Sequence, residues 1–184
     1  MEEFFDIVDE NGEPTGETIE RTRAHAEGIW HRTAHLWLLR KCGGEIQVLL
    51  QKRCENKDSF PGCYDISSAG HIPAGADYVA SALRELKEEL GITASAGQLI
   101  YCGSRRIEWD DVFHGKEYHD RQHTRVYGMW CDKDEADFTL QPEEVESVMW
   151  IETGRCIKAV RENTFKHCIE LEELMMVIEG MQCN

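Results

Sequence analysis

The chain has 184 residues, and 35 Asp and Glu against 20 Lys and Arg give it a formal net charge of −15. Its length and composition (41% hydrophobic, 30% charged) favour one globular domain over residues 1–184, with a core that needs no disulfide or metal staple. The acidity excludes a protein that coats nucleic acid or an anionic membrane, because both need a basic footprint. An anionic small molecule remains compatible with this charge where a metal ion supplies local positive charge.

Composition also predicts a cytoplasmic protein. No apolar run approaches the roughly 20 residues of a membrane span, and the N-terminus lacks the basic and apolar regions of a signal peptide. The eight cysteines form no CxxC pair and no zinc spacing, so we expect reduced thiols.

The predicted elements begin with a hairpin and a short helix within residues 1–30. Strands 4–8 and 15–19 flank an Asp-Glu-Asn-Gly turn, and a short helix covers 20–27. The last element is a long amphipathic helix at about 155–178. Further strands are expected at 34–39, 46–50, 65–71, 98–102, 124–131 and 147–151.

The strongest helix lies between Asp77, which suits the N-cap position, and Gly91, which suits the C′ position. At 100° per residue, its apolar residues gather on a side that would pack on a sheet. Glu85, Glu88 and Glu89 share another arc of roughly 100°. Strands combined with helices of this kind predict an α/β layered domain.

The three glutamates have two interpretations. Charge runs on helices are commonly solvated, and Glu is a good helix former. However, Glu85 and Glu89 are like charges four residues apart, and Glu88 and Glu89 lie near the helix C-terminus, where negative charge is disfavoured. Divalent cations held by carboxylate oxygens would offset both penalties, and Mg²⁺ leaves positions open for substrate phosphates.

The same glutamates belong to a longer pattern, GHIPAGADYVASALRELKEELGI, at residues 70–92. This segment resembles the Nudix box, which reads Gly, five residues, Glu, seven residues, then Arg-Glu-aliphatic-x-Glu-Glu-x-Gly-aliphatic. Every fixed position but one is kept. The resemblance implies a Nudix fold, with a mixed β-sheet in an α/β/α sandwich. It also implies cleavage of a diphosphate linked to another group, X.

The resemblance assigns roles to the residues of the box. Glu88 and Glu89 would be the main ligands of Mg²⁺ (or Mn²⁺), helped by the Gly70 carbonyl. Glu85 would complete the metal shell or act as the base, and Arg84 would hold the carboxylates in place. The cations would neutralise the diphosphate and lower the pKa of a water that attacks phosphorus.

Two points of the resemblance stay open. Ala76 stands where the family has Glu, which mainly braces the Arg of the motif; Asp77, one residue on, would partly replace it. Some family members place the base on a loop after the box. Glu143, Glu144 and Glu146 fit that position, and a solvated loop is an equal alternative.

A second resemblance reaches outside the box, to isopentenyl-diphosphate isomerase and its hydrolase-like relatives. In the isomerase, histidines matching His25, His31 and His71 bind a metal together with two downstream glutamates. Basic residues matching Arg53 and Lys57 hold the substrate diphosphate. An isolated histidine is more often structural or exposed than a ligand. The residues that carry the resemblance are His25, His31, Trp37, Gln51-Lys52-Arg53, Lys57, Phe60-Pro61-Gly62 and Gly70-His71.

Three departures favour hydrolysis over isomerisation. Ala69 replaces the isomerase's catalytic cysteine, and Cys63 does not match that position. The downstream metal glutamates have no clear match in the segment Asp-Arg-Gln-His at 120–123, where Gln122 occupies the best-matching position. The complete box array is present here, whereas the isomerase keeps only part of it. Diphosphate hydrolysis needs these retained carboxylates, and isomerisation needs the lost acid–base groups.

We therefore predict a metal-dependent Nudix hydrolase of the isomerase-like branch, acting on a nucleoside diphosphate linked to X or on another organic diphosphate. The alternatives are an isopentenyl-diphosphate delta-isomerase-like enzyme and a catalytically weak diphosphate-binding domain. Segments 104–109 and 114–125 would form a substrate lid or a polar surface insertion. The C-terminal helix, with Met175 and Met176, would pack on its own sheet or in a homodimer.

Overall fold

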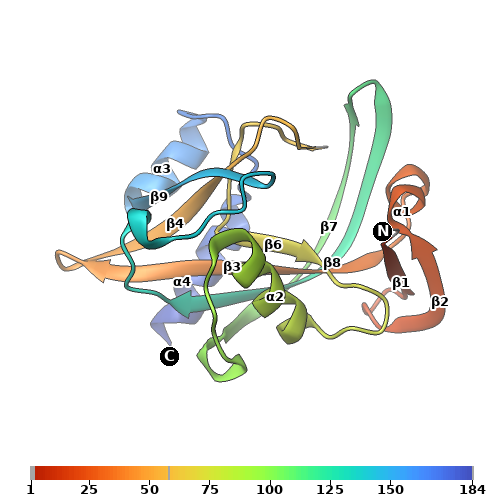
Figure 1. The fold of residues 1–184 in the computed structure, drawn as a ribbon, viewed down its shortest axis with the longest axis horizontal. Helices are drawn as coiled ribbons and strands as arrows, with labels where there is room; N and C mark the ends of the chain where they lie inside the picture. Colours follow the sequence, from red (N-terminus) through yellow and green to blue (C-terminus); the bar gives the residue numbers. More distant parts are fainter. Residues whose placement is uncertain (1–2, 58, 184) are drawn as a thin grey trace.

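A mixed β-sheet forms the middle layer of the protein. The computed structural model describes residues 3–57 and 59–183 (Figure 1). The strands follow the order β5-β4-β3-β8-β7, with β6 also paired to β3 and β9 to β4. Only β3 and β8 run parallel among the pairs described in this sheet. The strands are β3 (His31–Cys42), β4 (Glu45–Arg53), β5 (Tyr64–Asp65), β6 (Ser68–His71), β7 (Ile100–Phe113), β8 (Lys116–Trp130) and β9 (Val145–Glu152).

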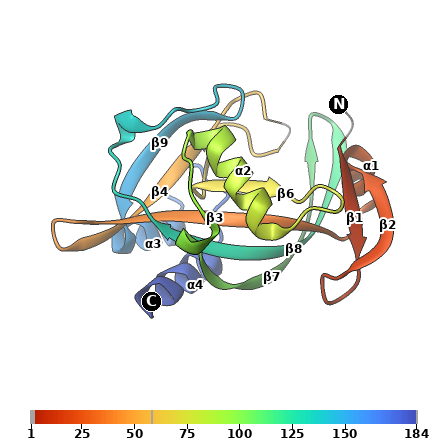
Figure 2. The same ribbon diagram turned by 60° about the horizontal axis from the view of Figure 1, so that its bottom comes forward.

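Helices cover both faces of this sheet, α2 on one and α3 and α4 on the other (Figure 2). Alternate residues of β3 separate the two cores, because successive side chains of a strand point to opposite faces. Leu36 and Leu38 pack beneath α2, and Trp37 and Leu39 pack beneath α3 and α4. The predicted α/β/α sandwich is therefore confirmed. The helices are α1 (Arg21–Glu27), α2 (Tyr78–Leu90), α3 (Thr153–Glu162) and α4 (Leu171–Gln182).

The N-terminal segment forms the expected hairpin, β1 (Phe4–Val8) and β2 (Pro14–Glu20), followed by α1. Phe5 and Ala24 are fully buried in a small core of their own. Phe5 also forms a backbone bridge to Pro73, just after β6. The hairpin is thereby fixed beside the loop that leads into α2.

The single C-terminal helix predicted at 155–178 is wrong, because two helices occupy this region. Asn163 ends α3 in the left-handed conformation, with φ of 50°, and its N–H bonds back into the helix. The chain then runs beside β5, where the Cys168 N–H donates to the Tyr64 carbonyl at 3.0 Å. This backbone pairing with a distant strand interrupts the helix, and the apolar periodicity on either side does not reveal it.

Strands β7 and β8 are much longer than predicted. They pair continuously from Ile100↔Gly128 to Phe113↔Lys116, with one bulge. Segments 104–109 and 114–125 therefore lie mostly inside a hairpin whose tip extends past the sheet (Figure 1). All eight cysteines are free in the described structure. Among residues 3–57 and 59–183, no helix is long and apolar enough to cross a membrane.

Candidate active site

Helix α2 places the three box glutamates at three depths. The helix begins after Asp77, whose carboxylate accepts from the Ala80 N–H at 2.9 Å, and ends at Gly91 in the left-handed conformation, as predicted. Glu88 is exposed, Glu85 is half-buried and Glu89 is only 6% exposed. The three glutamates therefore do not form one solvated face, because their arc descends from the surface into the protein.

Arg84 binds two of these carboxylates. Its guanidinium donates to Glu85 at 2.7 Å and to Glu88 at 2.9 Å. Ala76, the departure from the box, packs against the core beneath α2, and Asp77 caps the helix. Asp77 therefore does not take the place of the missing box Glu. The neighbouring glutamates themselves hold Arg84.

Burial keeps protons on the inner carboxylates of the metal-free protein. Loss of hydration raises the pKa of Glu89 to about 8 and that of Glu85 to about 7, although Arg84 opposes the shift at Glu85. The Glu89 Oε2 atom is buried without a hydrogen-bond partner among the described residues. A buried acceptor of this kind fits a cation that would replace the proton.

Gly70 provides the space into which Glu85 folds. A Cβ atom at position 70 would lie 2.2 Å from the Glu85 Cγ. The Glu85 side chain therefore lies directly over the β6 backbone, and only glycine permits this approach. The structure thus brings together the four predicted metal-binding residues, Gly70, Glu85, Glu88 and Glu89, around β6 and α2.

Predicted substrate-binding residues line one side of this centre. Lys57 pairs with Glu144, and both act on the Glu89 pKa, which Lys57 lowers and Glu144 raises. Arg53 is more constrained, because it donates to Asp65 at 3.0 Å and to the Ser59 carbonyl. Lys57 and Glu144 are therefore placed to act at the box. Arg53 shapes the loop beside it.

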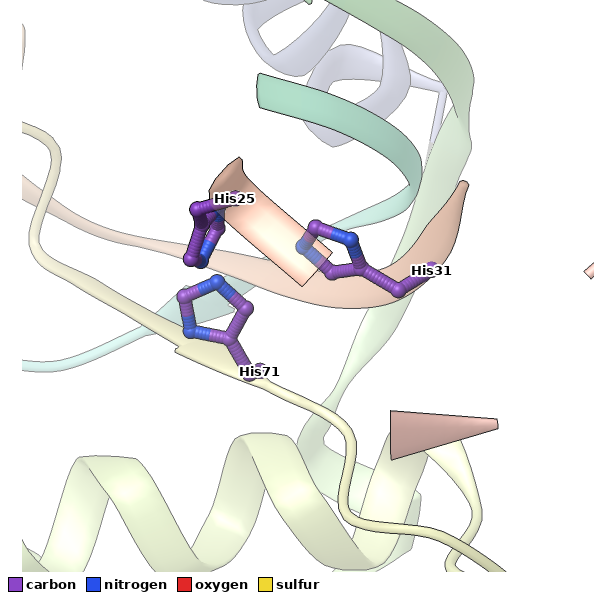
Figure 3. A group of neighbouring side chains, drawn as sticks. All are labelled: His25, His31 and His71. Carbon is purple, nitrogen blue, oxygen red and sulfur yellow. The ribbon is translucent and has the colours of Figure 1, made fainter. Parts of the chain in front are cut away.

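His25, His31 and His71 come together, from α1, β3 and β6 (Figure 3). Their ligand nitrogens all lie within 4.8 Å of one another. Asp120 of β8 adds a carboxylate, with Oδ1 3.8 Å from His25 Nδ1 and 3.9 Å from His31 Nε2. We call His25, His31, His71 and Asp120 the histidine cage. It lies on the face of β6 opposite to Gly70, since alternate residues point to opposite sides.

Most of the cage is buried, and several of its polar atoms lack partners among the described residues. His31 is fully buried and His25 is 4% exposed. Burial lowers the pKa of His25 to about 3 and that of His31 to about 4, so both rings are neutral at pH 7. The atoms without hydrogen-bond partners among the described residues include both nitrogens of His25, Nε2 of His31 and His71, and Oδ1 of Asp120.

The sequence did not predict Asp120 as a member of the cage. Gln122, the position singled out, instead donates from Nε2 to Asp120 Oδ2 at 2.7 Å and accepts from the Thr33 hydroxyl at 3.1 Å. These bonds hold Asp120 with Oδ1 free. The period of two along a strand is the signal that would have found it, because positions 120 and 122 share one face of β8.

Aromatic rings close the end of the site beyond the cage. Trp109 stacks on Tyr118, and Tyr118 stacks on His25 with ring centroids 4.3 Å apart. Phe60 lies edge-on to Trp109 and Phe113, at 5.0 and 5.2 Å. The tip of the β7–β8 hairpin therefore contacts the loop after β4 through these aromatic rings. This contact is consistent with the predicted substrate lid.

Comparison with known proteins identifies the family. A model of the NUDIX domain matches residues 29–166. A protein of Clostridium acetobutylicum, named as an uncharacterised Nudix hydrolase, is 39% identical over 152 residues, which cover 82% of this chain and 70% of that protein. Nudix hydrolase 3 of Arabidopsis thaliana is also 39% identical over 153 residues, and this match covers 82% of the chain but only 19% of the plant protein.

Solved structures share the fold. DR0079 from Deinococcus radiodurans superposes with a TM-score of 0.66 at 19% identity, covering 95% of this chain and 97% of that one. The NUDIX domain of NrtR from Shewanella oneidensis, solved with ADP ribose, superposes with a TM-score of 0.58 at 14% identity, covering 83% and 86%. The match of the NUDIX domain model to residues 29–166 and the 39% identity to the Clostridium acetobutylicum protein show that the chain belongs to the Nudix hydrolase family.

Proposed function

We propose that this Nudix hydrolase cleaves the diphosphate linkage of a nucleoside diphosphate-X, or of another organic diphosphate, with the help of Mg²⁺ or Mn²⁺. The observation that carries the proposal is the unpartnered, buried Glu89 Oε2 beside Glu85 and Gly70. NrtR's domain, bound to ADP ribose, shows that a similar fold holds such a molecule. The substrate is a small molecule, and no membrane or nucleic-acid surface is needed.

The residues have separate tasks. Glu85, Glu88, Glu89 and the Gly70 carbonyl would hold the cation, which supplies charge neutralisation of the diphosphate and acidifies a water. Arg84 keeps Glu85 and Glu88 oriented through its two ion pairs.

A general base and a lysine side chain complete the proposed active site. Glu85 would accept a proton from the attacking water, and Glu144 is the alternative base because it also lies close enough to affect Glu89. Lys57, now paired with Glu144, would move to a substrate phosphate. This exchange of partners keeps the lysine charge neutralised both with and without substrate.

The test is a hydrolysis screen over nucleotide, sugar and prenyl diphosphates with added Mg²⁺. Glu88→Gln keeps the shape of an exposed side chain but removes its charge, so we expect turnover to fall by orders of magnitude and folding to be unchanged. Glu179→Gln, an exposed glutamate on α4, is the control. Equal activity of the Glu88 variant, or no hydrolysis of any member of the panel by the wild type, would overturn the proposal.

We also propose that the histidine cage holds a second metal ion. Three neutral imidazoles and one carboxylate form a donor set that suits a transition metal better than Mg²⁺. Ligands of one bound zinc ion lie about 3.4 Å apart, so small ring rotations would bring together nitrogens that already lie within 4.8 Å of one another. His31 Nδ1 contacts the Ile29 carbonyl at 2.8 Å, which leaves Nε2 to face the cage.

Metal analysis tests the cage independently of activity. We expect His25→Gln to lose one equivalent of transition metal, and His167→Gln, a half-buried histidine outside the cage, to keep it. Retention of the metal by the His25 variant would exclude the cage as its site. Isopentenyl diphosphate should not be isomerised, because Ala69 and Gln122 lack the acid–base groups that moving a double bond requires. Product analysis after incubation decides this point.

A further inference from the structure

A polar pocket lies apart from the Nudix box glutamates and from the histidine cage. Its volume is about 200 Å³, and it opens between the β1–β2 turn, the start of α2 and the β7–β8 hairpin. Arg106 and Arg125 supply its free cationic side chains, and His123, Ser104 and Tyr78 complete its wall. Arg105 also belongs to the lining, but its guanidinium is paired with Glu173 at 3.0 Å. In β8, His123 and Arg125 alternate with Asp120 and Gln122. The pocket therefore opens on the α2 face of the sheet, and the cage lies on the other face.

The two arginines have no carboxylate partner among the described residues, although the chain carries 35 acidic residues. Arg106 lies over the Trp30 ring and Arg125 over the Tyr78 ring, each at 4.2 Å. Arg125 also reaches the Tyr127 side chain. Stacking fixes a guanidinium while leaving N–H groups on its edge to donate. The pocket thus holds two oriented guanidinium groups that are exposed to solvent and have no carboxylate partner among the described residues.

His123 is the third member of this group and lies across the strand pair from Arg106. Its Nε2 is buried without a hydrogen-bond partner among the described residues. Gly12 fixes the ring from the hairpin side, because a Cβ there would lie 2.7 Å from His123 Nδ1. An unpaired ring nitrogen beside two arginines is a costly arrangement for a pocket that holds only water.

Acidic groups near the pocket do not neutralise it. The Asp9 carboxylate accepts from the backbone N–H groups of Asn11 and Glu13, at 2.8 and 3.0 Å, and so maintains the turn. Glu13 lines the rim and forms no ion pair with either arginine in the described structure. The cations face the pocket, while these carboxylates shape its edge.

We infer that this pocket binds a phosphate group, either as inorganic phosphate or at the end of a small phosphomonoester. Arginine forks match the geometry of phosphate oxygens, and each bond to a charged oxygen is among the stronger hydrogen bonds in proteins. Typical ligand pockets enclose about 300–1,000 Å³, so the smaller volume fits a phosphate group better than a complete dinucleotide. The inference does not depend on the proposed hydrolysis.

Calorimetric titration of the metal-free full chain with inorganic phosphate tests the inference. Removing divalent cations with EDTA suppresses phosphate binding at the box, because the three box carboxylates then repel the anion and Lys57 is paired with Glu144. We expect Arg106→Gln/Arg125→Gln to weaken phosphate binding at least tenfold. Arg155→Gln/Arg161→Gln, which removes two exposed arginines of α3, should leave the affinity unchanged. Unfolding temperatures without phosphate confirm that both variants fold.

Three further readouts complete the test. Arg125→Lys keeps the charge but loses the fork, so its affinity should fall between those of the wild type and the double variant. In NMR spectra, phosphate should shift the His123 ring nitrogens, and Glu88→Gln should leave that shift intact. AMP, as a probe, distinguishes a phosphomonoester site from a site for free phosphate only. Absence of phosphate binding, or equal weakening in the two double variants, would overturn the inference.

Discussion

The Nudix helix and the histidine cage lie on opposite faces of β6, and they are assembled in opposite ways. The glutamates come from one helix within five residues of sequence. The cage collects its members from α1, β3, β6 and β8. Arg84 pairs with Glu85 and Glu88 at hydrogen-bond distance, whereas the only carboxylate beside the cage imidazoles among the described residues, that of Asp120, stays 3.8–3.9 Å from them. The difference places the proposed site for a hard cation and the proposed site of neutral nitrogen ligands on opposite sides of one short strand.

A third polar cluster on the same face as the cage sharpens this comparison. The Glu173 carboxylate is 2% exposed and accepts from His35 and Trp37 at 2.9 Å, and from Arg105 at 3.0 Å. This cluster is fully satisfied by protein groups. Among the described residues, the buried carboxylate of Glu173 is therefore paired internally, whereas the cage leaves several buried polar atoms without partners.

The largest expected effect separates the two sites. Glu85→Gln keeps side-chain volume but removes the charge that would hold a cation or accept a proton, so we expect turnover to fall by about 10²–10⁴-fold. The transition metal of the cage should remain, because Gly70 and Glu85 occupy the other face of β6. Steady-state kinetics and metal analysis of one preparation measure both quantities. Loss of both together would show that the two sites are coupled.

Glu173→Gln should cost about 3 kcal/mol in free energy of unfolding, since it leaves buried cations without their anion. Adding a metal chelator should not change this loss of stability, because no metal is proposed at the Glu173 cluster. At the histidine cage, a chelator should remove the proposed metal. Glu172→Gln provides the matched control, because that side chain is 80% exposed and contacts the same Arg105. Urea unfolding of both variants measures the difference, and equal stabilities would contradict the assigned role.

The same cluster predicts a pH window. Burial opposes the charged forms, but mutual attraction prevails: it raises the His35 pKa above 6.5 and, with help from Trp37 and Arg105, lowers the Glu173 pKa from 4.5 to about 2. The Glu173 contribution is complete above pH 4.5 and is lost toward pH 2. The His35 contribution is complete below pH 6.5 and is lost as pH rises through its raised pKa. The stability gap between wild type and Glu173→Gln should therefore be widest between pH 4.5 and 6.5.

Gln122→Leu should weaken metal binding at the cage by about 10–100-fold without removing a ligand. The leucine cannot donate to Asp120 Oδ2, so the carboxylate loses the bond that orients it. Competition with a chromogenic chelator measures the affinity. Gln122→Asn should not restore the affinity, because the shorter amide does not reach Asp120 Oδ2. Gln122→Glu should also fail to restore it, since an ionised carboxylate cannot donate a hydrogen bond to Asp120. Undiminished affinity in Gln122→Leu would exclude this positioning role.

The smallest effect is expected where the chain departs from the Nudix pattern. Ala76→Glu restores the family residue, yet Arg84 already binds Glu85 and Glu88. A further ion pair near the surface contributes roughly 0–1 kcal/mol, so turnover should change by less than about fivefold. Steady-state kinetics of Ala76→Glu and the wild type measure this change in turnover. A gain of a hundredfold would mean that Arg84 is poorly held in the natural chain.

Much of the fold could be predicted from local sequence signals, without knowledge of tertiary contacts. The α2 boundaries follow from the Asp77 cap and the left-handed Gly91, and the strand segments follow from apolar runs between turn residues. The box residues could be named because one helix spaces them, and helical spacing is a local property. The prediction of a single C-terminal helix failed at Asn163, where pairing with β5 overrides continuous amphipathicity.

Tertiary structure alone decided which polar groups are isolated from water. Sequence comparison singled out His25, His31 and His71, but Asp120 joined them only through the pairing of β8 with β3, and Gln122 became the residue that orients Asp120. Likewise, with a net charge of −15 the sequence analysis expected an anion site only where a metal ion supplies positive charge, yet folding stacks Arg106 and Arg125 on two rings beside one pocket. Charge and spacing can be read along the chain. Desolvation depends on what folds over each group, and it sets the pKa values and unpaired atoms that define the proposed sites.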